Sequence, residues 1–431
     1  MRYISSRGGA GSTDFEGALF SGYAIDGGLF MPESIPVLDF TTLQTWSSFS
    51  YPELVKQLCS IFISPELIPE PELYDLIERA FSRFRHKEVV HLSRLKNGLN
   101  VLELWHGATY AFKDLSLSCT GQFLQYFLKK RKKHVTILVG TSGDTGSSAI
   151  ESVRGEKNVD IFVLLPHGLC SKVQELQMTT VIEENVHVFL TEGNSDEIDE
   201  PIKELFADKD FSRKHNLMSL NSINWSRILV QIAHYFYAYF QSTPFMDNLP
   251  LPVVEICKEI CTPGFLFFGV AGCIAQKMGL PIELVAVVND NDIVHRAIQH
   301  GDFSMSRTVK STLASAMDIQ LSEGLRSYTV SDEEILQTMR QCKEDNHYLL
   351  CPHTATAVCY HYKHSDCHPS ICCLAPASPV KFEDAVCKAG LPLEVSSEIS
   401  KLKEMETRSC TLKRGENWAK ILQHQIEAVA K

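Results

Sequence analysis

The spacing of apolar residues divides the chain into a helical beginning and a longer stretch of alternating strands and helices. Within residues 1 to about 90, Tyr51–Leu58 and Pro71–Phe84 repeat apolar positions with the period of a helix. From about residue 98, short β-rich runs alternate with amphipathic segments. The predicted strands are 135–139, 161–165, 186–190, 281–288 and 371–374. The predicted helices between them include 171–181, 224–241 and one that opens with the capping-box pattern Ser331-Asp-Glu-Glu334.

Alternating strands and helices of this size predict an α/β fold with a parallel, doubly wound sheet. The 431 residues are enough for more than one domain. We expect a small N-terminal helical domain at 1–90, an α/β core of two subdomains at 91–385 and a helical tail at 386–431. The clearest linker is Pro244–Pro252.

Composition and charge narrow the classes of partner. The chain is 44% hydrophobic and 22% charged, with a formal net charge of −11. Its one dense basic run, Lys129–Lys133, therefore favours a solvated helix end over a nucleic-acid patch. We find no apolar stretch of membrane-spanning length and no apolar signal-peptide region after Met1. We expect a cytoplasmic protein without nucleic-acid or membrane partners. The sequence does not exclude secretion.

The 14 cysteines are scattered, a distribution that favours reduced thiols over a disulfide framework. Cys257 and Cys261 have no second pair at zinc-finger spacing, and we expect no metal site in this chain. Asn224-Trp-Ser226 matches a glycosylation sequon, but its place at a predicted helix start makes the match accidental.

The candidate chemistry centres on Lys113, a single lysine between Phe112 and Asp114 in a run that otherwise looks buried. Such an amine is either a buried ion-pair partner or a nucleophile toward carbonyl groups. Burial lowers the pKa of an amine, and only the neutral form can attack an aldehyde to form a Schiff base.

A second candidate site is Gly140-Thr-Ser-Gly-Asp-Thr-Gly146, where a predicted strand ends and a helix begins. Ligands of parallel sheets collect at such carboxyl ends, where backbone N–H groups and the helix dipole attract anions. The segment lacks the Gly-Lys-Ser/Thr of a P-loop and the spacing of a dinucleotide fingerprint. A plain strand-to-helix turn fits it equally well, and a nicotinamide oxidoreductase has no further support.

The two motifs together are more specific than either alone. Thr109-Tyr-Ala-Phe-Lys-Asp114, about thirty residues before Ser142-Gly-Asp-Thr-Gly146, resembles the threonine synthase family, and the chain is most similar to an animal branch of it. This family belongs to the fold-type II pyridoxal-phosphate enzymes, which share the fold of the tryptophan synthase β subunit. Further segments that resemble the family are 5–7, 26–32, 174–178, 192–196, 221–227 and 351–355.

The resemblance implies roles for individual residues. Lys113 corresponds to the lysine that binds pyridoxal 5'-phosphate covalently and moves substrate protons. Ser142, Gly143, Asp144 and Thr145 correspond to the segment that holds the substrate carboxylate.

Other positions have an implied role and a structural alternative. Thr354 corresponds to the residue that hydrogen-bonds the pyridine nitrogen, although a helix-capping threonine after Pro352 is the alternative. Asn224 and Arg227, together with Asn221 and Arg7, offer donors for a phosphorylated substrate. For each of these arginines, a surface ion pair is at least as good an interpretation.

Two segments depart from the family pattern. The glycine- and asparagine-rich turn that holds the cofactor phosphate is replaced by Thr262–Gly272, in which glycines remain but phenylalanines crowd the cradle. Gly264 is the cofactor contact expected to survive there. After Gln320 the chain jumps to a late strand and helix, so we expect a deletion that truncates the core.

The resemblance implies a pyridoxal-phosphate-dependent carbon–oxygen lyase acting on small phosphorylated amino acids. Its substrates would be O-phosphohomoserine and O-phosphothreonine, and its products α-ketobutyrate, ammonia and phosphate, as associated with the animal branch. Release of threonine is the other outcome, because one water molecule separates the two. The alternative is a catalytically impaired splice product or pseudoenzyme that acts by binding, for example as a secreted signalling factor. We expect a monomer or a homodimer.

Overall fold

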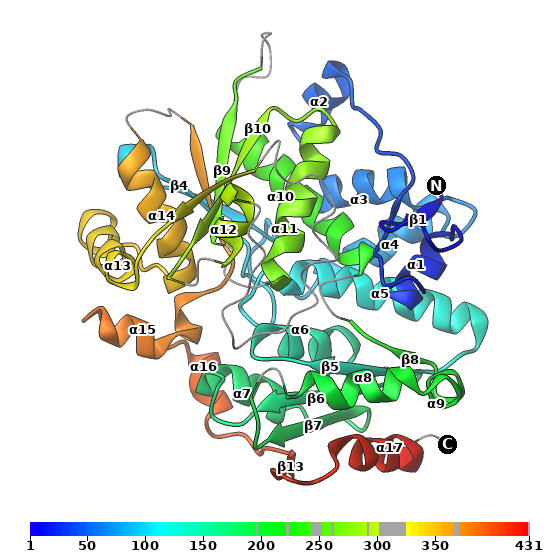
Figure 1. Cartoon of the computed structure of the whole chain (residues 1–431). Coiled ribbons are helices and arrows are strands. Elements are labelled where there is room, and N and C mark those ends of the chain that lie inside the picture. The colour runs from blue at the N-terminus through cyan, green and yellow to red at the C-terminus, as the bar shows by residue number, and fades with distance from the viewer. Residues whose placement is uncertain are drawn as a thin grey trace.

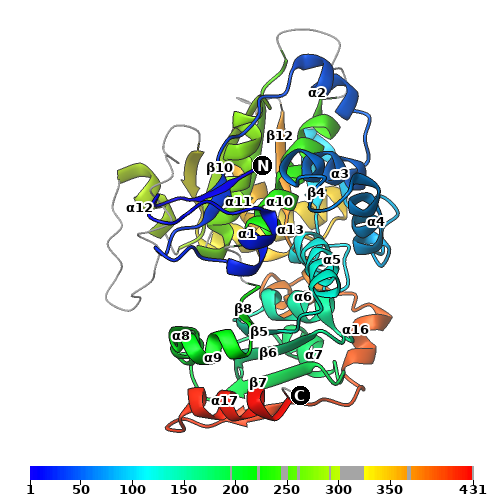
Figure 2. The same cartoon turned by 90° about the vertical axis from the view of Figure 1, so that its right-hand side faces the viewer.

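In the computed structural model the chain forms two lobes, each built around its own β-sheet (Figures 1 and 2). The structure describes residues 1–194, 197–220, 224–243, 251–259, 263–290, 293–300, 325–365 and 370–429. The N-terminal helices α3 and α4 lie beside the upper lobe. The C-terminal helix α17 lies at the bottom of the lower lobe.

The upper sheet has the strand order β11-β10-β9-β12-β4-β3, and its pairs are parallel except for β3–β4. The strands are β3 (His91–Arg94), β4 (Asn100–Glu103), β9 (Val254–Glu259), β10 (Ile282–Val288), β11 (Leu325–Thr329) and β12 (Ile371–Ala375). The central strands β9 and β12 are buried along their whole length, as expected for parallel strands covered on both faces.

The lower sheet is entirely parallel, with the order β13-β7-β6-β5-β8. Its strands are β5 (Val135–Gly140), β6 (Val159–Pro166), β7 (Val186–Thr191), β8 (Leu217–Met218) and β13 (Cys410–Leu412). The segment 386–431, expected as a helical tail, is not helical throughout, because it adds the edge strand β13 to this sheet. It also contributes α17, which packs against α8.

The N-terminal unit combines a two-stranded antiparallel ribbon with four helices. Its elements are β1 (Tyr3–Ser5), α1 (Phe15–Ser21), β2 (Phe30–Pro32), α2 (Phe40–Trp46), α3 (Tyr51–Phe62) and α4 (Glu70–Phe81). Ser50 caps α3 in a reciprocal capping box with Glu53. The two predicted helices of this region are confirmed, whereas the short ribbon was not predicted.

The remaining helices cover the faces of the two sheets. They are α5 (Lys113–Arg131), α6 (Asp144–Val153), α7 (Lys172–Thr179), α8 (Asp199–Ala207), α9 (Lys209–Lys214), α10 (Trp225–Ser242), α11 (Pro263–Lys277), α12 (Ile293–His300), α13 (Asp332–Asn346), α14 (Pro352–His364), α15 (Glu383–Lys388), α16 (Ser397–Leu402) and α17 (Trp418–Val429). In the described part of the chain, 3₁₀ turns lie at Lys96–Gly98 and Pro379–Lys381.

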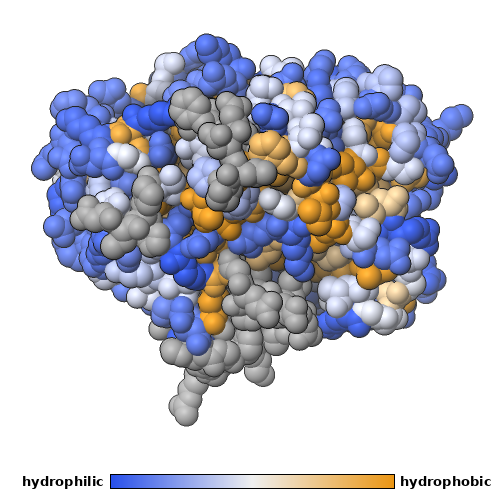
Figure 3. Space-filling view, turned by 90° about the horizontal axis from the view of Figure 1, so that it is seen from above, coloured by the Kyte–Doolittle hydropathy of each residue, from blue (hydrophilic) through white to orange (hydrophobic). Residues whose placement is uncertain are grey.

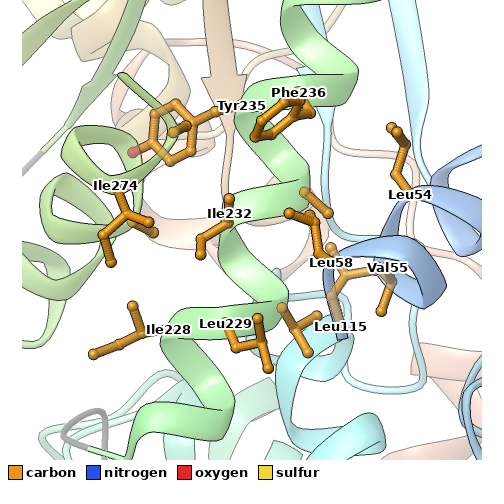
Figure 4. Packing of buried hydrophobic residues seen from close by; sticks show 14 of the residues in the cluster. Leu54, Val55, Leu58, Leu115, Ile228, Leu229, Ile232, Tyr235, Phe236 and Ile274 are labelled. Atoms are coloured by element: carbon orange, nitrogen blue, oxygen red, sulfur yellow. The ribbon is translucent and has the colours of Figure 1, made fainter. Parts of the chain in front are cut away.

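Helix α10 is the centre of the largest hydrophobic core, and every residue from Trp225 to Phe240 is buried. Figure 4 shows Ile232 and its neighbours on α10 between residues of α3, such as Leu58, on one side and Ile274 of α11 on the other. Because α10 also packs against α5, this core links the N-terminal unit to the helix that begins at Lys113.

The parallel α/β prediction is confirmed, as are all five predicted strands and the capping box that opens α13. Strands β3, β4, β8, β9, β11 and β13 were missed. The expected turn at 262–272 was wrong, because the backbone from residue 263 to 277 forms the single helix α11. Gly272 lies inside this helix, where a Cβ atom would come within 2.7 Å of the Tyr235 ring. The linker residues 244–250 and the predicted deletion site after Gln320 lie outside the described residues.

Three further findings concern the surface, the helices and the cysteines. Seen from above, apolar side chains form a band on one half of the molecule, between areas of polar residues (Figure 3). Among the described residues, no helix is long and apolar enough to cross a membrane. Twelve of the cysteines are described, and all of these are free thiols.

Candidate active site

The carboxyl ends of three neighbouring parallel strands bring the candidate residues together. Strands β9, β12 and β4 are adjacent and parallel, so the segments that follow them meet at one edge of the upper sheet. The segment after β4 is fixed to the segment after β12, because Phe112 N–H donates to the Pro376 carbonyl (2.7 Å) and Ala111 pairs with Ala377. These contacts position the start of α5.

Lys113 is the first residue of α5 and is partly buried. Its Nζ lies 5.3 Å from the centre of the Phe112 ring, and its charge helps to lower the pKa of Asp144 in the lower lobe. The amine therefore lies within electrostatic range of the N-terminus of α6 in the lower lobe.

Asp114 shapes the loop before Lys113 and does not act as its simple ion-pair partner. Its buried carboxylate accepts hydrogen bonds from the N–H (2.7 Å) and the hydroxyl (2.6 Å) of Thr109. Burial raises the pKa of Asp114, and the Thr109 hydrogen bonds oppose that rise. Gly107 is required beside it, because an added Cβ atom would come within 2.4 Å of Asp114 Cβ.

The opposite wall of the site is the N-terminus of α6, where Asp144 and Thr145 are the first helical residues. Thr141 Oγ1 accepts hydrogen bonds from Gly143 N–H (3.1 Å) and Gly146 N–H (3.2 Å), and these bonds fix the turn. Ser142 is exposed on the turn. Because the first N–H groups of a helix have no acceptor within it, this end of α6 attracts anions.

Lys381, which sequence reasoning missed, is completely buried beside this helix end. Its Nζ lies 2.6 Å from Asp144 Oδ1 and donates a 2.7 Å hydrogen bond to the Thr109 carbonyl. Gln174 Nε2 donates to the same carboxylate oxygen (2.8 Å). Although burial opposes ionisation, the Lys381 and Lys113 charges lower the pKa of Asp144, so it is a carboxylate at neutral pH. Lys381 thereby ties the lower lobe to the loop that carries Lys113.

Two further cationic groups were also missed. Lys258, at the end of β9, is buried with its Nζ 3.8 Å from the centre of the Phe112 ring. His353, in the first turn of α14, has its Nε2 3.8 Å from Glu259 Oε2. Burial opposes its charge, but Glu259, Cys351 and Asp144 raise the pKa of His353 to about 9. With Lys113 and Lys381, these groups place four basic side chains around the site, and the carboxylates of Asp144 and Glu259 lie among them.

We expect His353 to make stability depend on pH. A pKa raised from about 6.5 to about 9 means that the protonated ring stabilises the fold. This contribution is complete below about pH 6.5 and is lost as the pH rises through about 9. Since 26% of the side chain is exposed, we discount it to about 1 kcal/mol. Urea unfolding of the wild type and His353→Gln should differ by this amount at pH 6 and converge at pH 10. An equal difference at both pH values would contradict the prediction.

Of the other predicted site residues, some lie beside Lys113 and Asp144 and others lie elsewhere in the fold. Thr354 is buried in the first turn of α14, and Cys351, not Thr354, caps that helix. The backbone of Gly264 lies in the first turn of α11, directly after β9, whereas Asn221 lies outside the described residues. Arg7 is exposed, and its guanidinium donates to the Asp26 carbonyl (2.9 Å) in the N-terminal unit.

Asn224 and Arg227 are buried at the start of α10. Asn224 caps that helix by accepting from Ser226 N–H, and its Nδ2 donates to the Leu19 carbonyl (2.6 Å). Arg227 Nε donates to the hydroxyl of Ser116, on the first turn of α5 (3.5 Å), and burial lowers its pKa to about 10. Arg227 is therefore near the Lys113 helix turn, and its role toward substrate stays a prediction.

The site contains chemical groups of the types that pyridoxal 5'-phosphate requires. Lys113 offers an amine for the aldehyde, Thr354 a buried hydroxyl for a ring nitrogen and the start of α11 a helix N-terminus for the phosphate. Residues 260–262, just before that helix, lie outside the described part of the chain.

Comparison with known proteins shows similarity to pyridoxal-phosphate enzymes over most of the chain. The family model "Threonine synthase N terminus" matches residues 2–81, and "Pyridoxal-phosphate dependent enzyme" matches residues 85–368. The human protein Threonine synthase-like 2 is 60% identical over an alignment that covers 100% of this chain and 98% of that protein. That alignment spans 476 positions, more than the 431 residues here, so the relative contains residues that have no counterpart in this chain.

More distant relatives and solved structures agree. Threonine synthase of Saccharomyces cerevisiae is 37% identical over 89% of this chain and 88% of its own length. The crystal structure of the yeast threonine synthase has a TM-score of 0.88, with 34% identity and 99% coverage of both chains. The structure of threonine synthase from Brucella melitensis with bound pyridoxal phosphate has a TM-score of 0.87, with 30% identity and 99% coverage of both chains.

Proposed function

Because this chain belongs to the threonine synthase family of pyridoxal-phosphate-dependent enzymes, we propose that it is a phospho-lyase for small phosphorylated amino acids. Its substrates are O-phosphohomoserine and O-phosphothreonine, and its products are α-ketobutyrate, ammonia and phosphate. The choice of α-ketobutyrate over threonine follows the similarity to the animal relatives. The observation that carries the proposal is the position of Lys113 opposite the Asp144–Lys381 pair at the N-terminus of α6.

The charges of the site support an anionic substrate. Lys381 neutralises Asp144, so the α6 N-terminus can attract a carboxylate without repulsion from that side chain. Lys258 and His353 add positive charge on the β9 and α14 side of the site. Asp144 and Glu259 offset Lys381 and His353, so Lys113 and Lys258 are the basic groups that a substrate with both a carboxylate and a phosphate would meet.

Individual residues have separate roles in this proposed reaction. When bound, pyridoxal phosphate supplies an electron sink for the negative charge that develops at the substrate Cα. Lys113 is the base that removes the Cα proton, because its amine acts on the α6 N-terminus that would hold the substrate carboxylate, whereas Asp114 is bound to Thr109. Within Ser142–Thr145, the N–H groups other than that of Gly143, which donates to Thr141, orient the substrate carboxylate. Thr354 places a hydroxyl at the ring nitrogen.

Product analysis of the full chain with added pyridoxal phosphate tests the proposal. O-Phosphohomoserine and O-phosphothreonine should each give phosphate, ammonia and α-ketobutyrate in equal amounts, while homoserine and threonine give none. Threonine formed in the same amount as phosphate would replace the lyase by a synthase. Saturable cofactor binding with no product from either substrate would favour the non-catalytic binding protein.

A further inference from the structure

A cluster of imidazole rings lies beside the loop that precedes Lys113, and it contains none of the residues of the candidate active site. His86, Glu88 and His91 offer one potential metal-binding atom each, and these three atoms lie within 4.8 Å of one another. In the described part of the chain, this is the one group of three such residues close enough to share a metal ion. The His86 ring lies 4.8 Å from the His91 ring and 4.9 Å from the His106 ring.

The contacts within the cluster leave its nitrogen atoms poorly used. His91 Nδ1 is 3.5 Å from Glu88 Oε2, longer than a hydrogen bond, and it makes no hydrogen bond within the described residues. His86 Nδ1 accepts a long hydrogen bond from Glu88 N–H (3.2 Å). His106, by contrast, is committed to Glu103 at 2.8 Å. His86, Glu88 and His91 are thus the side chains of this cluster that can bind a ligand.

We propose that His86, Glu88 and His91 form a binding site for a divalent transition-metal cation of the zinc class. Two imidazoles and one carboxylate, with a fourth position for water, are a ligand set that zinc accepts. Ligand atoms about 2.1 Å from a tetrahedral centre lie roughly 3.4 Å apart, so the widest pair must approach by about 1.4 Å. Glu88 is exposed and both histidines are only partly buried, so the three side chains can make this movement. A cation at His86 Nδ1 takes the place of the Glu88 N–H donor.

The position of the site gives the cation a structural effect on the Lys113 loop. Arg85, next to His86, donates its backbone N–H to the His106 carbonyl (2.9 Å) and its guanidinium to the carbonyls of Gly107 and Ala108. A cation that joins His86 to His91 would anchor this segment to strand β3. The inference stands apart from the phospho-lyase proposal, because none of its residues belongs to the candidate active site.

The test uses Co²⁺ alone as a spectroscopic probe on the full chain, after alkylation of its accessible thiols. We expect one equivalent of Co²⁺ to give a visible d–d band of nitrogen and oxygen ligands, without a thiolate charge-transfer band. Zn²⁺ should displace the Co²⁺. His91→Ala and Glu88→Gln should weaken the binding at least tenfold, while His424→Ala, at an exposed histidine of α17, should not change it.

Two outcomes would overturn the proposal. One is the absence of saturable Co²⁺ binding by the wild type, and the other is unchanged affinity in both His91→Ala and Glu88→Gln. The circular-dichroism melting temperature of each variant without metal separates loss of ligands from loss of fold. Glu88→Gln keeps the size of an exposed side chain, so it is the variant whose folding is least at risk.

Discussion

Replacing Lys113 with alanine is expected to lower phosphate release from O-phosphohomoserine by at least about a thousandfold, because the base and the cofactor-binding amine are lost together. The fold should persist, since Lys113 is only partly buried and starts, rather than fills, α5. The measurement is a phosphate-release assay at saturating substrate, with far-ultraviolet circular dichroism to confirm that the variant is folded. Added methylamine should restore part of the rate by supplying a small amine in place of the missing one.

Lys129→Ala is the matched control, because Lys129 is an exposed lysine near the other end of the same helix. It should release phosphate at the wild-type rate. If Lys113→Ala also kept that rate, Lys113 would have another role, and the assignment of the site would be wrong. If wild type, Lys113→Ala and Lys129→Ala were all inactive, the non-catalytic alternative would be favoured instead.

The sequence predicted the fold where local patterns decide it. The strands β5, β6, β7, β10 and β12 are short apolar runs bounded by turns, and their periodicity alone was sufficient. Strand β9 was missed because charged residues, Lys258 and Glu259, end a strand that tertiary contacts bury completely. The ribbon of β1 and β2 was missed because two three-residue strands carry almost no periodic signal.

The candidate site was predictable as far as its motifs are continuous in the sequence. Lys113 and Gly143–Thr145 were found because each belongs to a recognisable run, and the structure brings the two runs to facing edges. Lys381 was not found, since its partner Thr109 is 272 positions away and no local pattern marks a buried lysine. The only available signal was a lysine directly before Phe382 in an otherwise apolar stretch after β12. The predicted roles toward substrate stay predictions.

Lys381→Met should strongly destabilise the protein and impair turnover, because it removes one partner of a buried ion pair. Asp144 would keep its charge in a largely buried position, with Gln174 as its remaining donor. Breaking such a pair lowers the free energy of unfolding by about 3 kcal/mol or more. Phosphate release should fall by roughly tenfold to a hundredfold, since the uncompensated carboxylate repels an anion at the α6 N-terminus. Urea unfolding and the phosphate assay measure the two effects.

A second substitution separates the charge from the packing of Lys381. In Lys381→Met/Asp144→Asn no unpaired charge remains, so part of the lost stability should return, and the effects of the single changes should not add. Lys388→Met is the matched control, because Lys388 is exposed on α15, and its unfolding free energy should stay within about 0.5 kcal/mol of the wild type. A Lys381→Met protein as stable as this control would show that the Asp144–Lys381 pair does not hold the two lobes together.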